Sequence, residues 1–455
     1  MRKILVIGSG KSSSYLIKYL LEKSDEENLL IIVGDINFSH AKKLIGGHEN
    51  AQAIMLDVFN KKSRQEAVKN EDIVVSMLPA RFHIEVAKDC ITFNKNMVTA
   101  SYISAEMQTL DRAAKDKGLI FMNEIGVDPG IDHMSAMEVI DRIRDNGGNV
   151  ILFESFTGGL VAPESDNNLW NYKFTWNPRN VVVAGQGGGA AKFLQENKYK
   201  YISYNRLFRR TEFLDIDGYG RFEAYANRDS LKYQNVYGLD NARTLYRGTM
   251  RRVGFSRAWN VFVQLGMTDD SYTIDDSENM SYRDFVNAFL PYSPTDSVEL
   301  KFRHALKIDQ DDVVWDKFVE LDLFSKTKLV GLKKSTPAQI LTKILMDSWT
   351  LDKDDKDMIV MYHKFGYELD GKNYQIDATM VTLGEDQTYT AMAKTVGLPV
   401  AMATLAILNE RIKTPGVQMP IHKEVYEPIL RELKNYGITF NEKKVPYLGY
   451  NPLHI

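Results

Sequence analysis

The amino-acid sequence predicts an α/β protein with two main parts: an N-terminal Rossmann-like domain built on a parallel sheet, and an α+β substrate domain with a helical insertion. Three observations lead to this prediction. Short β-branched runs alternate with amphipathic segments through the first third of the 455 residues, as in a parallel sheet with crossover helices. New strand-like runs begin at Val150. Between about residues 269 and 354, charged helix-forming sequence replaces strands.

The first strand, KILVIG, runs into Gly8-Ser9-Gly10 and then into a helix that we expect to begin near Ser12. Glycines at such a turn let a dinucleotide pyrophosphate approach the helix N-terminus. An ordinary strand-to-helix turn is the alternative, but its position after the first strand of an alternating pattern favours a cofactor site. The predicted contacts are Gly8, Ser9, Gly10, Lys11, Ser12 and Ser13, with Ser13 in place of the third fingerprint glycine.

The second strand, LLIIVGD, ends at Asp35, where an acid is expected to bind the adenosine ribose hydroxyls. A carboxylate there repels a 2′-phosphate, so the sequence favours NAD, with NADP the less favoured cofactor. A solvated turn residue is the alternative, because Gly-Asp pairs are common at strand ends. Further cofactor contacts are predicted after the second, third and fourth strands, at Ile36, Asp57, Val58, Leu78, Pro79 and His83. His83 can also simply begin a helix.

Two later segments, NMVTASYIS and NEIGVDPGIDHMSAM, follow successive strands at the edge where open α/β sheets bind ligands. A helix is expected from Ile131 to Asp145. Asp128 and Pro129 also suit the N-cap and first position of that helix, and this role is compatible with ligand binding. Asp128, Asp132 and His133 have metal-binding side chains, but hydride transfer to a dinucleotide needs no metal, so we expect none.

The domain boundaries follow from these changes of pattern. We expect a Rossmann domain over 1–128, completed by 390–455, because the apolar helix-forming sequence near Leu398 must be covered by another layer. The substrate domain is expected over 129–268 and 355–389, where two strand-like runs meet at Asp370-Gly371, a strong hairpin signal. Residues 269–354 are expected to form a helical subdomain. Gly187–Gly189 lacks the ending of a phosphate loop and predicts a mobile loop.

Composition excludes several classes of partner. The 57 basic and 60 acidic residues nearly cancel, so no net field attracts nucleic acid or an anionic membrane. Cys90 is the single cysteine, which excludes an intramolecular disulfide and suits a reducing compartment. The apolar run at the start stops at Gly8, and the stretch Leu398–Leu408 is shorter than the about 20 residues of a membrane span. We therefore expect a cytoplasmic protein.

The sequence also resembles the saccharopine dehydrogenases of the glutamate-forming type, including the dehydrogenase half of the bifunctional aminoadipic semialdehyde synthase. The segments that carry the resemblance cover nearly the whole chain: the two segments around Tyr102 and Asp128, then SFTGGLVAPESDNNLWNYKFTW, YANRDS, RGTMR, KDMIVM, AMAKTVGLPVAMA and EVYEPIL. The resemblance implies oxidation of saccharopine with NAD and water to L-glutamate and 2-aminoadipate 6-semialdehyde. It also implies a role in lysine metabolism, in the degradative direction, and a homodimer.

The resemblance further implies a set of saccharopine contacts at Ser101, Tyr102, Asp128, Arg228, Thr249, Met250 and Arg251. Saccharopine has three carboxylates, which guanidinium groups bind bidentately; an exposed ion pair is the alternative role for either arginine. Asp128 and Tyr102 are the predicted catalytic residues, since they can orient the substrate amine and relay protons. The family usually has a cysteine at the position of Thr157, so a sulfur there is not essential in this chain.

Two other functions compete with this one. A carboxynorspermidine dehydrogenase would share the architecture, but its more cationic substrate suits the paired Arg228 and Arg251 less well. A dinucleotide-sensing protein without turnover would also keep the fold, because fold alone does not establish activity. The retained substrate motifs argue against the sensor.

Overall fold

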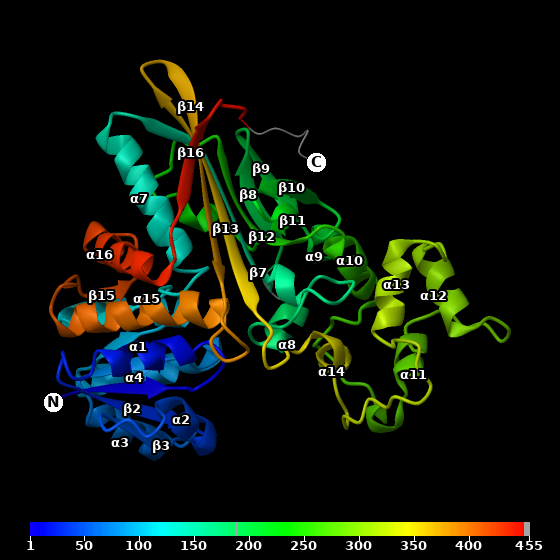
Figure 1. Ribbon diagram of the computed structural model, residues 1–455, viewed down its shortest axis with the longest axis horizontal. Helices are drawn as coiled ribbons and strands as arrows, with labels where there is room; N and C mark the ends of the chain where they lie inside the picture. The colour runs from blue at the N-terminus through cyan, green and yellow to red at the C-terminus, as the bar shows by residue number, and fades with distance from the viewer. Residues whose placement is uncertain (187–188, 450–455) are drawn as a thin grey trace. The chain divides into compact units, whose positions relative to one another are not determined.

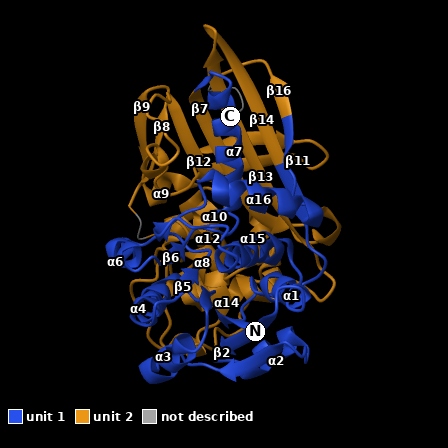
Figure 2. Cartoon of the chain, turned by 90° about the vertical axis from the view of Figure 1, so that its left-hand side faces the viewer, with its two compact units in different colours: residues 1–149, 380–442 blue, residues 150–379, 443–455 orange. Residues whose placement is uncertain are grey.

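The computed structural model describes residues 1–186 and 189–449, which divide into two compact units (Figure 2). The first unit comprises Met1–Asn149 and Met380–Glu442, and the second comprises Val150–Thr379 and the chain from Lys443 onwards. The finer three-part division expected from the sequence stays a prediction. Gly187 and Gly188 of the expected mobile loop lie outside the described residues.

A parallel sheet forms the centre of the first unit (Figure 1). Its strands are β1 (Arg2–Ile7), β2 (Leu29–Asp35), β3 (Ala51–Met55), β4 (Ile73–Ser76), β5 (Asn96–Val98), β6 (Ile120–Met122) and β15 (Gly416–Gln418). Within the described residues they run in the order β15-β6-β5-β4-β1-β2-β3, and neighbouring strands are parallel. The strand order reverses between β1 and β4, which is the switch point where open α/β sheets bind ligands.

Helices connect and cover these strands. They are α1 (Ser14–Glu22), α2 (Phe38–Ile45), α3 (Lys61–Lys69), α4 (His83–Phe93), α5 (Ala105–Gln108), α6 (Asp111–Asp116), α7 (Ile131–Asp145), α15 (Ala391–Leu408) and α16 (Lys423–Leu433). One core cluster joins sheet residues such as Leu5 and Val74 to Val68 of α3 and Val86 of α4. Figure 1 shows α15 beside α1. The two helices approach closely, since a Cβ on Gly397 would lie 2.7 Å from the Leu16 nitrogen.

Helix α15 is long and apolar enough, by length and composition alone, to cross a membrane. Its mean hydropathy is 1.7 over 18 residues, and 72% of that window is buried inside the protein. The apolar stretch Leu398–Leu408 noted in the sequence is thus the second half of a longer helix. Burial of this extent is what a core helix shows, so the helix is weak evidence for a membrane span.

A second sheet organises the second unit (Figure 1). Its strands are β7 (Asn149–Val161), β8 (Ala191–Gln195), β9 (Lys198–Ile202), β10 (Thr211–Ile216), β11 (Gly220–Ala226), β12 (Thr244–Arg252), β13 (Asp357–Leu369), β14 (Lys372–Leu383) and β16 (Asn441–Val445). In the part of the chain that the structure describes, the main path is β10-β11-β12-β7-β13-β14-β16, with β8 paired to β12 and β9. The turn from β13 to β14 is Asp370-Gly371, with φ of 50° and 72°, as a tight hairpin requires.

Aromatic side chains hold the helical insertion to this unit. The helices of the second unit are α8 (Pro178–Val182), α9 (Tyr204–Leu207), α10 (Phe255–Leu265), α11 (Tyr282–Asn287), α12 (Val298–Leu306), α13 (Val313–Glu320) and α14 (Pro337–Trp349). Trp170 stacks on Phe262 of α10 at 5.7 Å and meets Phe318 of α13 edge-on at 5.7 Å. Trp349 of α14 lies 5.2 Å from Trp170. The predicted fold class, a Rossmann-like parallel sheet with a second sheet domain, is confirmed.

Candidate functional site

The glycine turn after β1 lies at the switch point of the first sheet. Gly8 has φ +103°, and a Cβ there would lie 2.9 Å from the Met77 carbonyl oxygen beyond β4. Gly10 differs, because no protein atom lies within 4 Å of where its Cβ would be. Helix α1 begins at Ser14, two residues later than expected, and has no acid in its first turn. Open space over Gly10 beside the positive end of a helix fits a pyrophosphate group.

Two serines of this turn, Ser9 and Ser13, are buried inside it. Ser13 is buried, and its hydroxyl donates to the Gly8 carbonyl oxygen at 3.1 Å. Ser9 has no exposed surface. Gly10 and Lys11 are exposed and Ser12 is half-buried. Of the six predicted contacts in the turn, Gly10, Lys11 and Ser12 are therefore the ones that face outwards.

Asp35 at the end of β2 holds this turn in place. One carboxylate oxygen accepts from the Ser9 backbone N–H at 2.6 Å and from the Ser9 hydroxyl at 2.8 Å. The other accepts from the Asn37 N–H at 2.7 Å. Partial burial works against ionisation, yet the hydrogen bonds from Ser9 and Asn37 keep the pKa of Asp35 below its ordinary value. Both oxygens of this carboxylate are thus engaged within the protein.

We expect Asp35→Ala to weaken the turn rather than to switch cofactor preference. The variant loses three hydrogen bonds to a charged acceptor, and leaving N–H groups unsatisfied costs about 1–3 kcal/mol. Thermal unfolding should show a lower Tm, and steady-state kinetics should show a higher KM for NAD and NADP alike. Asp35→Asn keeps an oxygen acceptor and should be milder in both measurements. An unchanged Tm with only the NADP-to-NAD ratio altered would make Asp35 a ribose contact instead.

The other predicted cofactor contacts lie around the ends of β2, β3 and β4. Ile36 is 68% exposed. Asp57 and Pro79 are exposed, and Val58 and Leu78 are half-buried at the edge of the core cluster. The sequence did not single out Phe59, which is 71% exposed and meets Phe82 edge-on at 4.9 Å. Its aromatic side chain, four residues after the end of β3, was the available signal.

His83 is the centre of a buried hydrogen-bond chain. It begins α4 and is 4% exposed. Its Nδ1 lies 2.8 Å from the Ser76 hydroxyl at the end of β4, and its Nε2 lies 2.7 Å from the Ser101 hydroxyl after β5. Thr99 lies farther from Nε2, at 3.4 Å. Burial lowers the pKa of His83 to about 4, so the ring is neutral near pH 7. The sequence did not indicate the link to Ser101.

Tyr102 and Asp128 come together in the first unit. The Tyr102 hydroxyl donates to an Asp128 carboxylate oxygen at 3.2 Å, and both residues are half-buried. Glu124, which has a positive φ of 53°, lies in the same region of the first unit. One Glu124 oxygen accepts from the Ile103 N–H at 3.0 Å, and the other lies 3.0 Å from His133 Nε2. This buried pair ties the segment that carries Tyr102 to the first turn of α7.

The turn that carries Asp128 also requires glycine. Gly130 has φ +148°, and a Cβ there would fall 2.0 Å from the Gly126 oxygen. The Asp128-Pro129 peptide bond is cis. Gly130, not Asp128, is the N-cap of α7, so the N-cap role considered for Asp128 is wrong. A turn precedes the helix. In this turn the Gly126 N–H donates to the Pro129 oxygen at 2.8 Å.

In the second unit, β12 carries three of the predicted saccharopine contacts. Thr249 lies opposite Thr157 of β7 and opposite Tyr225 of β11. Arg251 follows two residues later and shares the face of Thr249, because side chains alternate along a strand. Met250 points to the other face and is fully buried. Its side chain is therefore part of the core.

Arg251 is a buried cation with aromatic neighbours. It is 5% exposed, and its guanidinium lies 5.0 Å from the Tyr172 ring and 5.4 Å from the Phe255 ring. One Nη donates to the Met250 oxygen at 2.8 Å, and Nε has no hydrogen-bond partner. Across residues 1–186 and 189–449, no carboxylate lies within ion-pair distance of Arg251. A buried charge is normally paired, so this guanidinium is suited to an anionic ligand.

Arg228 differs from Arg251 in its setting. It lies in the loop after β11, is exposed, and has a positive φ of 49°. Its carbonyl oxygen accepts from the Lys192 N–H at 2.8 Å. Thr157 stands where the resemblance implies a cysteine in relatives, and its buried hydroxyl has no hydrogen-bond partner among the described residues.

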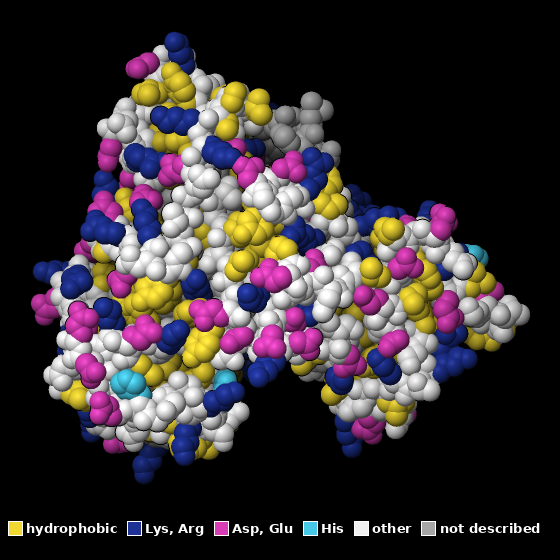
Figure 3. All heavy atoms as spheres, in the orientation of Figure 1, with side chains coloured by type: hydrophobic (Ala, Val, Ile, Leu, Met, Phe, Trp, Pro, Cys, Tyr) yellow, Lys and Arg dark blue, Asp and Glu magenta, His cyan; other side chains and the backbone are white. Residues whose placement is uncertain are grey.

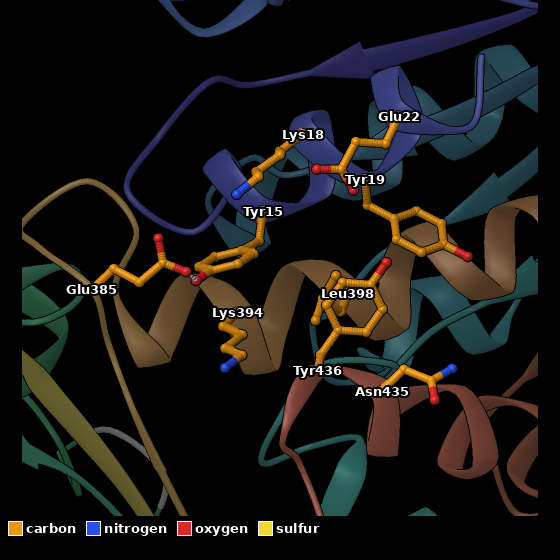
Figure 4. A pocket seen from close by; sticks show the side chains of 9 residues that line it. All are labelled: Tyr15, Lys18, Tyr19, Glu22, Glu385, Lys394, Leu398, Asn435 and Tyr436. Atoms are coloured by element: carbon orange, nitrogen blue, oxygen red, sulfur yellow. Dashed lines mark hydrogen bonds between the residues drawn. The ribbon is translucent and has the colours of Figure 1, made fainter. Parts of the chain in front are cut away.

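A surface depression of about 250 Å³ lies elsewhere in the first unit (Figure 4). Residues of α1, α15 and the segment after α16 line it, and Figure 4 shows the Tyr15 hydroxyl pointing at Glu385, to which it donates at 2.5 Å. Lys18 lies 5.0 Å from the Tyr389 ring centre. No predicted site residue lines this depression.

Charge is dispersed over the surface. Figure 3 shows acidic and basic side chains interspersed on the face in view, in keeping with a net charge of −3. Among the described residues, no group of three or more His, Cys, Asp or Glu side chains has the arrangement to hold a metal ion.

Comparison with known proteins gives matches over almost the whole chain. Residues 4–122 match the saccharopine dehydrogenase NADP binding domain, and residues 126–438 match the saccharopine dehydrogenase C-terminal domain. The chain is 32% identical to the saccharopine dehydrogenase [NADP(+), L-glutamate-forming] of Saccharomyces cerevisiae, covering 98% of this chain and 99% of that protein. A solved apo structure of saccharopine dehydrogenase (L-Glu forming) from that yeast has a TM-score of 0.87, with 98% and 100% of the two chains covered.

Mammalian relatives are longer. The mitochondrial alpha-aminoadipic semialdehyde synthase of Rattus norvegicus is 34% identical over 97% of this chain, which spans 47% of that protein. The chain therefore spans about half the length of this relative.

The expected preference for NAD is wrong. The matching domain is described as NADP binding, and the fungal relatives are named as NADP(+) enzymes. The prediction treated Asp35 as a residue free to bind the ribose, whereas its carboxylate oxygens accept hydrogen bonds from Ser9 and Asn37. The sequence shows that a carboxylate follows β2 but not that its oxygens are already engaged by the turn.

Proposed function

Because this chain belongs to the saccharopine dehydrogenase family, we propose that it oxidises saccharopine with NADP and water to L-glutamate and 2-aminoadipate 6-semialdehyde, as part of lysine metabolism. The observation that carries the proposal is Arg251, a buried guanidinium that no carboxylate of the described chain pairs with. A substrate with carboxylate groups would complete that pair. The homodimer and the cytoplasmic location stay predictions.

The dinucleotide would be held at the turn after β1, where Gly10 leaves open space next to the N-terminus of α1. A dinucleotide held there would supply the hydride acceptor for oxidation of the carbon next to the secondary amine that becomes the aldehyde. Water then adds to the oxidised carbon, and the carbon–nitrogen bond breaks to release glutamate and the aldehyde. The protein's task is to bind and orient the substrate and to move protons.

The residues of the first unit suit the proton transfers. The amine of saccharopine must lose its proton before the adjacent carbon can release hydride, since a protonated nitrogen cannot stabilise the developing positive charge. Tyr102 and Asp128 are half-buried, and because the Tyr102 hydroxyl donates to Asp128, the pair offers acceptor oxygens to the amine. We assign them to orienting the amine and accepting its proton, with Ser101 as a binding residue. Arg228, Thr249 and Arg251 would bind the carboxylates.

The reaction is tested by mixing the purified protein with saccharopine and either NADP or NAD. We expect reduced dinucleotide to appear in the absorbance trace together with stoichiometric glutamate, and a higher kcat/KM with NADP. Carboxynorspermidine serves as the matched control, since it keeps the secondary amine but carries more positive charge. Turnover of carboxynorspermidine without turnover of saccharopine would overturn the proposal, and so would dinucleotide binding without turnover of either.

A further inference from the structure

The hydrogen-bond chain through His83 spans the carboxyl ends of two adjacent strands. Ser76 ends β4, Ser101 follows β5, and these strands are parallel neighbours with Val75 opposite Val98. His83 occupies the space between the two hydroxyls, with contacts of 2.8 Å and 2.7 Å. The hydrogen-bond chain thus runs from the fully buried Ser76, near the switch point, to the half-buried Ser101.

The hydroxyl proton of Ser76 determines which group donates in each hydrogen bond of this chain. Ser76 has no exposed surface, and His83 Nδ1 is the hydrogen-bond partner that the described part of the chain offers its hydroxyl. A buried hydroxyl that fails to donate leaves its proton unsatisfied at a cost. Ser76 therefore donates to Nδ1, which must be the unprotonated nitrogen. In a neutral imidazole the other nitrogen then carries the proton.

This tautomer determines what Ser101 can offer a ligand. With its proton on Nε2, His83 donates to the Ser101 oxygen at 2.7 Å. The Ser101 hydroxyl then keeps its own proton and can donate it outwards. In the opposite tautomer Ser101 would donate to Nε2, and only its lone pairs would face a ligand. A carboxylate oxygen can accept the Ser101 proton when His83 is the Nε2–H tautomer. It is repelled by the Ser101 lone pairs when His83 is the Nδ1–H tautomer.

We infer that His83 is a positioning residue, held by Ser76 as the Nε2–H tautomer, so that the Ser101 hydroxyl is directed to donate to a carboxylate oxygen of the substrate. The inference rests on the proposed function, in which Ser101 contacts saccharopine. It gives His83 a role different from the cofactor contact that the sequence predicts.

The tautomer can be measured without any turnover. Two-bond ¹H–¹⁵N correlation spectra of the full-length protein, labelled with ¹⁵N-histidine, distinguish the two neutral forms. The chain has eight histidines, and the His83 signals are those absent from His83→Gln. We expect the Nε2–H pattern in the unaltered protein and loss of that single pattern in Ser76→Ala. An Nδ1–H pattern, or no change on removing the Ser76 hydroxyl, would overturn the inference.

Kinetics then test what the tautomer does. His83→Leu keeps the volume but loses both hydrogen bonds, and we expect the KM for saccharopine to rise about tenfold. His83→Gln can still donate to Ser101 through its amide and should stay within about twofold of the unaltered enzyme. Ser101→Ala should match His83→Leu, and the two changes combined should be no worse than Ser101→Ala alone, since they remove the same interaction. The KM for NADP is the internal control and should not move.

The outcomes separate the two claims. If the effects of His83→Leu and Ser101→Ala multiply, the residues act independently and His83 does not act through Ser101. If the KM for NADP rises instead, His83 is a cofactor contact. If the unaltered protein shows no saccharopine turnover, the proposed function fails, while the spectra still decide the tautomer.

Discussion

Arg251→Leu is expected to lower kcat/KM for saccharopine by between about 30-fold and about 5000-fold, because removing one partner of a buried charge pair costs about 2–5 kcal/mol. The side chain is 5% exposed and lacks a carboxylate partner among the described residues, and under the proposed function a substrate carboxylate supplies the anion. Steady-state kinetics measure the effect. Arg251→Lys keeps the charge but loses the planar fork, and we expect an intermediate loss.

The thermal stability of Arg251→Leu should stay unchanged although its activity falls. Leucine removes a buried charge from aromatic surroundings, and replacing such a charge with an apolar side chain is often neutral or stabilising. The Tm of the ligand-free protein should therefore stay close to that of the unaltered enzyme. Arg252→Leu is the matched control, since Arg252 points to the other face of β12 and donates to the Tyr219 oxygen at 2.6 Å. A collapse of Tm in Arg251→Leu, or equal kinetic losses in both variants, would make Arg251 a structural residue.

Gly10→Ala is expected to raise the KM for NADP by between about fivefold and about 150-fold while leaving the Tm of the free protein unchanged. The new methyl group would meet no protein atom within 4 Å, so a bound ligand is the group it would hinder. Overfilling a closely packed contact costs about 1–3 kcal/mol. Kinetics with varied NADP and thermal unfolding without ligand give the two readouts.

Gly8→Ala provides the contrast. Its φ of +103° and the Met77 oxygen 2.9 Å from the added Cβ predict a strained and destabilised fold. Its Tm should fall before any cofactor is added. If Gly10→Ala lost stability as Gly8→Ala does, or left the KM for NADP unchanged, the cofactor would not pass over Gly10.

Local sequence patterns predicted the local structure well. Helix α7 runs from Ile131 to Asp145 as expected, because its apolar positions recur at helical spacing. The hairpin at Asp370-Gly371 also follows from local chemistry, since both residues adopt the positive φ that the turn requires. The pairing of β7 with β12 and β13 in one sheet has no local signature. It depends on contacts between residues far apart in the chain.

The candidate site shows the same limit at the level of single side chains. Sequence identified Asp35 but did not show that its carboxylate oxygens accept hydrogen bonds from Ser9 and Asn37. The contacts predicted at Thr249, Met250 and Arg251 are consecutive, and alternation along a strand could have shown that Met250 faces away from its neighbours. The pairing of Glu124 with His133 had no sequence signal, because it brings the residue after β6 against the first turn of α7.

The discontinuous make-up of the first unit bears on how the protein is synthesised. Strand β15 and helix α15 are encoded after the whole second unit up to Thr379. At a translation rate of about 5–20 residues per second, roughly 15–60 s pass between the emergence of residue 149 and that of residue 442. During this interval the apolar face of α1, which includes Leu16, lacks its helical partner α15. The first unit therefore exposes apolar surface during synthesis, and its fold closes only when residues 380–442 have left the ribosome.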